Sequence, residues 1–414
     1  MELESNDINK IKKFIQNTPH RFLAPLKFSD KSRFFLLHLI NNFKSEFQSK
    51  QIFAQTSVEA RFIDATYPFP KSYSYGTIPP EIDAKINDHP KYLYKATVNI
   101  YGRTYNFNVM LFAKFQKENK LRAEAEEIVN QSCLWLRIGT KYAPVYCSKT
   151  VDVFFYMTDE KKVLPSRDRD YVDMIHANTA FTTSCSANTQ ITLFRKEEWF
   201  KVFIHESFHN LGLDFSQFPE PNEAANAEIL RAFPINSEVK LYESYCEMWA
   251  ETLNVIIINV LKHPRTGAEN MMAHIERDMQ FERLYSLFQS AKLMNHFGIC
   301  YKDLFEITST SCVEKRNQFK EKTAIFSYFI IKSLLMYNID AFMEWCLINN
   351  NGSFGFKNPD TNVVKYAREL VISKHRDPNY LRTIENVEKT CFSPKTIVPN
   401  MKFIYGNLRM SVFG

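Results

Sequence analysis

The chain has 414 residues, of which 45% are hydrophobic and 14% aromatic, and it carries a formal net charge of +6. This composition supports a sizeable core and excludes a disordered or fibrous chain. The lysines and arginines form no run of five or more, so we expect no nucleic-acid partner. The acidic, polar N-terminus and the short or interrupted apolar stretches also predict no signal peptide, no membrane-spanning helix and no membrane partner.

The predicted elements divide the chain into three parts. Residues 1–90 give helical signals followed by a proline-rich connector. Residues 91–215 alternate apolar and polar side chains around one long helix, and residues 216–414 give helical signals only. The expected elements are helices within 5–50, strands over 94–101 and 104–115, a helix over 120–139, strands over 151–158 and 191–195, a helix over 197–211, and helices around 238–262, 272–296, 320–337 and 360–374.

The helix over 197–211 contains the pattern His-Glu-x-x-His as His205, Glu206 and His209. Two histidines four residues apart lie on one face of a helix, so their ring nitrogens can converge on one metal ion. Glu206 lies beside them, where it can act as a general base towards a metal-bound water. The pattern therefore predicts a Zn²⁺ site, and the alternative is a buried amphipathic helix that happens to carry two histidines.

A catalytic zinc site needs a third protein ligand and leaves a fourth position for water. The extended metzincin pattern is incomplete, because Phe215 occupies its third histidine position and Asp214 lies one residue out of register. Glu243, Glu247 and Glu251 are spaced by four along one predicted helix face without basic residues at matching positions. Such a series is either a charged, solvent-exposed helix face or a set of carboxylates whose mutual repulsion is offset by a bound cation. Glu247, Glu243 and Asp214 all remain candidates for the third ligand.

The motif of His205, Glu206 and His209, followed by Glu247-Met-Trp-Ala-Glu251, resembles the gluzincin family of zinc peptidases. More narrowly, residues 151–254 are similar to predicted metallopeptidases encoded by large nucleocytoplasmic DNA viruses. The resemblance implies an α+β, zincin-like fold, in which a small mixed sheet with a backing helix and an active-site helix precedes a largely helical lower subdomain. It also implies that Glu247 is the third zinc ligand and that Glu251 hydrogen-bonds a ligand histidine.

Three further expectations concern the surroundings of the site. Tyr242 and Tyr245 are candidate donors to the oxyanion, although Tyr245 points to the far side of a regular helix unless that helix begins late. The strand over 191–195 is expected to form the sheet edge that receives a peptide. The eight cysteines have no paired C-x-x-C spacing and are expected to be reduced, although Cys185 could also cap the zinc.

These patterns together predict a zinc-dependent peptidase that acts on a peptide or protein substrate. It is expected in the cytoplasm, either of an infected host or within a virion, and not among secreted proteins. The alternative is a structural or scaffolding virion protein that uses a zincin fold without catalysis. The sequence gives no indication of the substrate, the cleavage preference or the oligomeric state.

Overall fold

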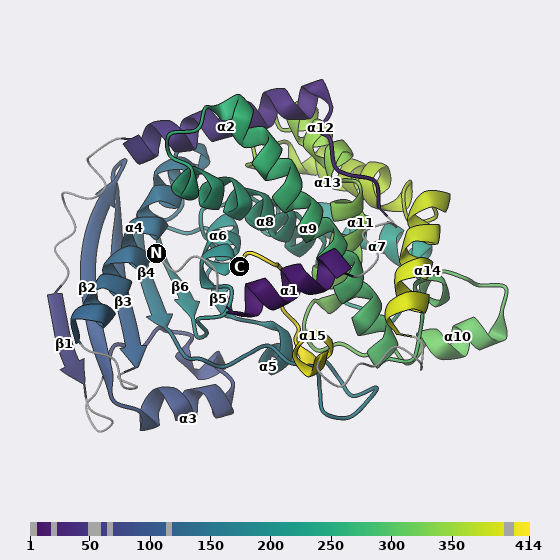
Figure 1. The fold of residues 1–414 in the computed structure, drawn as a ribbon, viewed down its shortest axis with the longest axis horizontal. Coiled ribbons are helices and arrows are strands. Elements are labelled where there is room, and N and C mark those ends of the chain that lie inside the picture. Colours follow the sequence, from purple (N-terminus) through teal and green to yellow (C-terminus); the bar gives the residue numbers. More distant parts are fainter. Residues whose placement is uncertain (1–5, 18–22, 49–58, 64–68, 113–117, 393–400) are drawn as a thin grey trace.

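The computed structural model describes residues 6–17, 23–48, 59–63, 69–112, 118–392 and 401–414. It has a mixed α+β fold, with an open mixed sheet at one end and helices through the rest of the molecule (Figure 1). Parts of three predicted elements, at residues 49–50, 65–68 and 113–115, lie outside the described residues.

The sheet has six strands in the order β1-β2-β3-β4-β6-β5. The β1/β2, β2/β3 and β5/β6 pairs are antiparallel, whereas β3/β4 and β4/β6 are parallel. Their bounds are Glu59–Ile63, Lys91–Ile100, Arg103–Phe112, Thr150–Tyr156, Ala180–Thr182 and Asn188–Leu193, for β1 to β6. Tyr101 and Gly102 join β2 to β3 with positive φ angles of 47° and 78°, as in a two-residue hairpin turn whose twist matches its strands.

The prediction that residues 191–195 form the sheet edge is wrong. These residues lie mainly in β6, which pairs with β4 on one side and β5 on the other. The edge next to the motif helix is β5, a strand of three residues that gives too short an alternation to be recognised in the sequence.

Helices cover both faces of the sheet. The long helix α4 (Glu118–Tyr142) packs on β2 and β3 and also contacts the motif helix. On the other face, α3 (Pro80–Asp88) contributes Ile82 and Ile86 to a smaller apolar cluster with side chains of β2, β3 and β4. The parallel strands β4 and β6 are therefore largely buried, whereas Lys95, Thr97 and Asn99 of β2 are exposed.

The remaining chain is helical, as predicted. The helix α8 (Leu241–Lys262) is buried over most of its length and packs against the motif helix, α2 (Asp30–Gln48) and α9 (Ala268–His296). The other elements are α1 (Asn6–Asn17), η2 (Tyr75–Thr77), α5 (Met174–Ala177), α7 (Pro219–Ala232), η3 (Tyr301–Leu304), α10 (Thr310–Arg316), η4 (Phe326–Ile331), α11 (Lys332–Tyr337), α12 (Ile339–Asn349), α13 (Pro359–Tyr366), η5 (Ala367–Ile372), α14 (Pro378–Cys391) and α15 (Lys402–Gly406).

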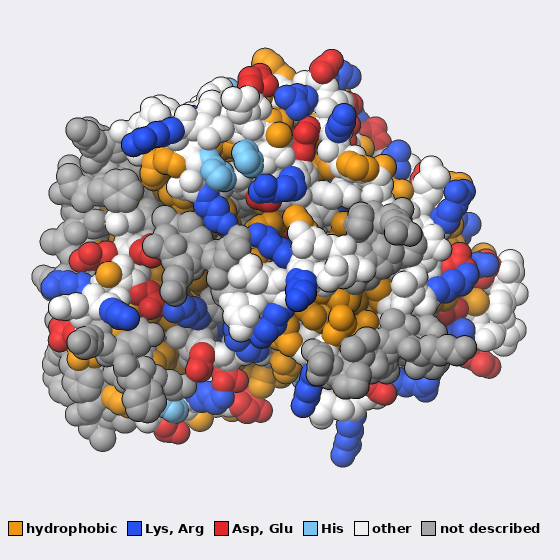
Figure 2. Space-filling model, in the orientation of Figure 1, with side chains coloured by type: hydrophobic (Ala, Val, Ile, Leu, Met, Phe, Trp, Pro, Cys, Tyr) orange, Lys and Arg blue, Asp and Glu red, His pale blue; other side chains and the backbone are white. Residues whose placement is uncertain are grey.

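One apolar core connects the three predicted parts of the chain, because its members extend from Ile8 to Phe413. The first two helices contribute to this core: α1 packs on α9, and α2 crosses α8, α9 and α12 (Figure 1). None of the described helices is long and apolar enough to cross a membrane. Figure 2 shows lysine and arginine side chains distributed across one face of the molecule among acidic and apolar ones.

Candidate metal centre

The motif helix α6 extends from Trp199 to Asn210, close to its predicted range. It starts after Glu198, which has a positive φ of 58°, and the chain turns away at Gly212, whose φ is 65°. A side chain at Gly212 would also place its Cβ atom 2.9 Å from the sulfur of Cys147. The left-handed backbone and this contact explain why glycine follows the helix.

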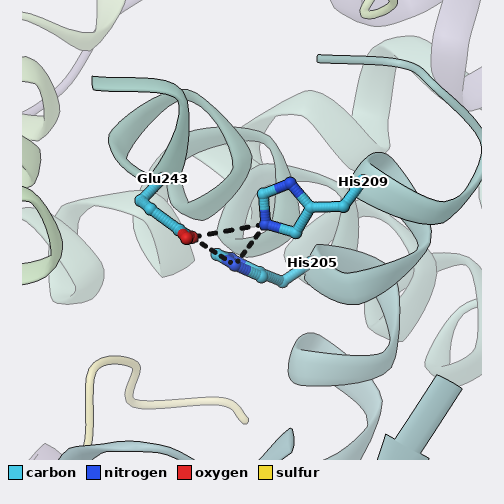
Figure 3. Close-up of side chains that lie close together, drawn as sticks. All are labelled: His205, His209 and Glu243. Carbon is cyan, nitrogen blue, oxygen red and sulfur yellow. Dashed lines mark hydrogen bonds and ion pairs between the residues drawn. The ribbon is translucent and has the colours of Figure 1, made fainter. Parts of the chain in front are cut away.

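Three side-chain atoms converge beside α6 (Figure 3). Nε2 of His205 and Nε2 of His209 lie 3.2 Å apart, and Oε2 of Glu243 lies 3.0 Å from the first and 3.3 Å from the second. Tetrahedral zinc at about 2.0–2.1 Å from nitrogen and oxygen ligands keeps those ligands roughly 3.3 Å apart. The spacing and the two-imidazole, one-carboxylate set therefore fit a zinc ion with a fourth position left for water.

The second nitrogen of each histidine faces a buried carboxylate. Nδ1 of His205 lies 2.9 Å from Oε1 of Glu247, an ion-pair contact without hydrogen-bond geometry, and Nδ1 of His209 forms a hydrogen bond of 2.5 Å with Oδ2 of Asp214. A carboxylate at this position favours the tautomer with a proton on Nδ1, which leaves the lone pair of Nε2 for a metal.

The series of glutamates is present, but its register differs from the one implied by the gluzincin resemblance. Glu243 lies at the two Nε2 atoms, where Glu247 was expected, and Glu247 takes the supporting contact that was expected of Glu251. Glu251 contacts no ligand histidine, and its Oε1 lies 2.6 Å from Nζ of Lys332. Residues four positions apart are about 6 Å apart along a helix axis, so only one of these glutamates reaches the metal position.

Two other candidates lie away from the three converging atoms, and Tyr245 faces the far side of its helix, as expected for a regular helix. Asp214 lies at the outer nitrogen of His209 and not at the Nε2 cluster. Tyr245 faces the core, where its hydroxyl donates a hydrogen bond of 2.6 Å to the carbonyl oxygen of Phe354. Tyr242 remains near the site, with its ring 5.8 Å from that of His209.

The general-base candidate Glu206 lies in the wall of a cavity of about 20 Å³ next to His205. Glu206 is 8% exposed and His205 is 4% exposed, so both are nearly enclosed. Burial raises the pKa of Glu206, which moves this carboxyl towards the range in which a general base works at neutral pH. The cavity has room for about one water molecule.

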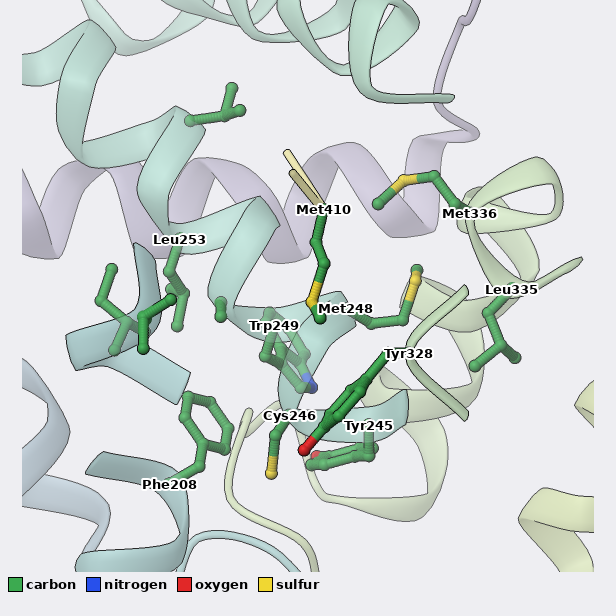
Figure 4. Packing of buried hydrophobic residues seen from close by; sticks show 14 of the residues in the cluster. Phe208, Tyr245, Cys246, Met248, Trp249, Leu253, Tyr328, Leu335, Met336 and Met410 are labelled. Carbon is green, nitrogen blue, oxygen red and sulfur yellow. The ribbon is translucent and has the colours of Figure 1, made fainter. Parts of the chain in front are cut away.

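The sequence did not indicate two residues that line this cavity, Tyr328 and Met410. Tyr328 belongs to η4, a turn of π-helix, and its ring centre is 6.1 Å from that of His205. Met410 is held there because Glu198 accepts hydrogen bonds from the backbone N–H groups of Met410 and Ser411. Figure 4 shows Tyr328 and Met410 among the packed side chains around α8. No motif marks either residue; a π-turn is a frequent feature of functional sites but has no sequence signature here.

A disulfide bond lies at the end of the motif helix, so the prediction that all eight cysteines are reduced is wrong for two of them. Cys147 and Cys185 form this bond, with their Cα atoms 4.8 Å apart, and Cys185 is therefore not free to cap a zinc ion. The backbone N–H of Cys185 donates a hydrogen bond to the carbonyl oxygen of His209. This hydrogen bond connects the turn before β6 to His209, and the disulfide connects the same turn to Cys147.

No protein-family model, curated protein or solved structure matches this chain. The resemblance to gluzincins and to viral metallopeptidases therefore rests on the motif residues, and the family, the viral source and the location remain predictions. The geometry of the cluster stands independently of them.

Proposed function

We propose that the protein is a zinc-dependent peptidase whose metal ligands are His205, His209 and Glu243. The observation that carries this proposal is the convergence of the three ligand atoms at 3.0–3.3 Å from one another, with Glu206 lining a small cavity next to His205. A purely structural zinc site needs neither a general base nor a fourth coordination position open to water.

The chemistry follows from the arrangement of these groups. His205, His209 and Glu243 would hold the zinc ion, which would lower the pKa of a bound water to about 7 and polarise the scissile carbonyl. Glu206 accepts the proton of that water and passes it to the leaving amine. We assign the oxyanion donor to Tyr328, because its side chain lines the same cavity. Burial raises the pKa of Tyr328, so its hydroxyl keeps the proton that it would donate as a hydrogen bond.

The substrate is proposed to be an extended peptide bound along β5. In an antiparallel pair, alternate residues direct their backbone groups to the partner strand. Because Phe194 N–H binds Thr179 and Thr183 N–H binds Gln190, the backbone groups of Ala180 and Thr182 point away from β6. These groups offer the free edge to which a peptide strand can be added. Ala180 also lines the cavity beside Glu206, which would place the peptide over the metal.

The fold that we propose to accompany this function is zincin-like. It is supported by a mixed sheet with an antiparallel edge strand, by the backing helix α4, and by a motif helix that packs against a ligand-bearing helix from the helical part of the chain.

The test combines metal analysis with hydrolysis. The purified protein should contain about one zinc per chain by emission spectroscopy and should cleave a peptide library in a chelator-sensitive manner. Glu206→Gln should keep the zinc but lose about 10²- to 10⁴-fold in rate, whereas Glu223→Gln on the exposed surface of α7 should change neither. A protein that binds no zinc would exclude this function. A protein that binds zinc without hydrolysing any peptide would instead favour the structural alternative.

A further inference from the structure

A lysine on the motif helix is completely buried. Lys201 precedes His205 by four residues and therefore lies in the same row of the helix as both histidines. Its side chain is 0% exposed, and its Nζ lies 2.7 Å from Oε2 and 3.0 Å from Oε1 of Glu247. A buried ammonium group is costly to desolvate, so its presence on this helix calls for a physical explanation.

The carboxylate of Glu247 joins this lysine to the metal centre. Its Oε1 lies 3.0 Å from Nζ of Lys201 and 2.9 Å from Nδ1 of His205, so one oxygen atom is shared by the two nitrogens. The second oxygen is occupied by Lys201 alone. The lysine thus fixes both oxygens of the group that contacts the outer nitrogen of a ligand histidine.

Stability gives no sufficient reason for this arrangement. Buried ion pairs contribute little net stability compared with apolar residues of similar volume, because desolvation offsets their attraction. Carboxylates that contact a ligand histidine, by contrast, commonly change metal affinity by about 10- to 100-fold when they are removed. The position of Lys201 is therefore better explained by the metal centre than by the core.

We propose that Lys201 is a positioning residue for the metal centre: it holds Glu247 against Nδ1 of His205, so that Nε2 of His205 is directed to the point shared with His209 and Glu243. This inference rests on the proposed zinc site and extends it from the ligands to a buried cation that contacts none of them.

The chain contains a matched control one turn further along α8. Lys332 and Glu251 form a second buried pair, with Nζ 2.6 Å from Oε1 and side-chain exposures of 1% and 0%. Among the described residues, this pair contacts none of the three proposed ligands. Lys201→Met and Lys332→Met therefore each remove one buried charge, and only the first removes a hydrogen-bond partner of Glu247; Lys332 also donates to the carbonyl oxygen of Met410.

The experiment measures zinc affinity by competition with a chromophoric chelator, on variants whose folding is verified by circular dichroism. Lys201→Met should bind zinc about 10-fold or more weakly than the unmodified protein. Lys332→Met should stay within about twofold, although both variants lose stability to unfolding. Equal affinities for Lys201→Met and the unmodified protein would overturn the proposal.

A double-mutant cycle separates positioning from general damage. If Lys201 acts through Glu247, then adding Lys201→Met to Glu247→Gln should cause no further loss of affinity beyond about twofold. A further tenfold loss would show an independent, structural effect and would refute the inference. The double variant leaves no unpaired buried charge, so it remains measurable even where Lys201→Met alone does not fold.

These outcomes are distinct from a failure of the proposed function. In that case the unmodified protein itself would bind no zinc.

Discussion

Zinc binding should displace about one proton from His205 at neutral pH. Burial alone would lower the pKa of His205, but the nearby carboxylates of Glu247 and Glu243 raise it to about 9. Burial likewise opposes protonation of His209, and Cys246 and Asp214 raise its pKa well above the ordinary value. In the metal-free protein the imidazole of His205 is therefore protonated at pH 7.

The size of the effect follows from the shift of His205. At pH 7, about two units below its pKa, the ring is roughly 99% protonated, and removing that proton costs about 2.7 kcal/mol, or 100-fold in zinc affinity. For an imidazole with the ordinary pKa of about 6.5, deprotonation at pH 7 would weaken zinc binding by less than a factor of two. Through His205, the apparent affinity should therefore rise about tenfold per pH unit up to about pH 9.

The pH dependence has the opposite sign for the stability of the metal-free fold. The protonated form of His205 is favoured by folding, so its contribution is complete below about pH 6.5 and disappears as the pH rises through about 9. Zinc binding, which needs the neutral rings, becomes stronger over that interval.

Titration calorimetry in two buffers of different ionisation enthalpy counts the released protons. We expect about one from His205 at pH 7 and about half as much at pH 9. Glu247→Gln removes the carboxylate that most raises the pKa of His205, so this variant should release about one proton fewer at pH 7. Release of less than about half a proton from the unmodified protein at pH 7 would refute the reasoning, because it would show that the ring of His205 is already neutral.

Three further predictions concern single residues. Glu243→Gln should lose most of the bound zinc by emission spectroscopy, whereas Glu247→Gln should weaken binding by about 10- to 100-fold without abolishing it; the reverse order would restore the gluzincin register. Tyr328→Phe should lower kcat by about 10²-fold with zinc content unchanged, and an unaltered kcat would remove the tyrosine from the mechanism. Cys147→Ser opens a loop of 38 residues closed by Cys185, so chemical denaturation should report a loss of roughly 4 kcal/mol, against no change if the bond does not form in the protein.

Local geometry explains which parts of the site were predictable from the sequence. The i, i+4 spacing of His205 and His209 fixes their shared face without reference to the rest of the chain. The alternation on either side of Gly102 likewise specified the β2–β3 hairpin. In both cases the deciding interactions lie within a few residues, and the structure contains the helix and the hairpin where they were expected.

Which glutamate serves as the third ligand could not be predicted from local sequence patterns. The spacing of Glu243, Glu247 and Glu251 is a local feature of the sequence. Which of them contacts the histidines depends on the position of α8 along the axis of α6. That offset is set by tertiary packing between helices separated by α7 and is not encoded in the spacing of the glutamates. For the same reason the pairing of Cys147 with Cys185 and the approach of Tyr328, more than a hundred residues beyond the motif, carried no usable signal.

The small cavity beside His205 and Glu206 also has a kinetic consequence. With about 20 Å³ of space and ligands that are almost fully enclosed, neither a peptide nor a chelator can reach the ion while the surrounding elements stay packed, so both need the same local opening. Metal loss then waits for a local opening of the fold, whose frequency is set by the stability of that region and not by the strength of the coordinate bonds. Prolonged incubation, more than a higher chelator concentration, would then govern how fast the metal is stripped.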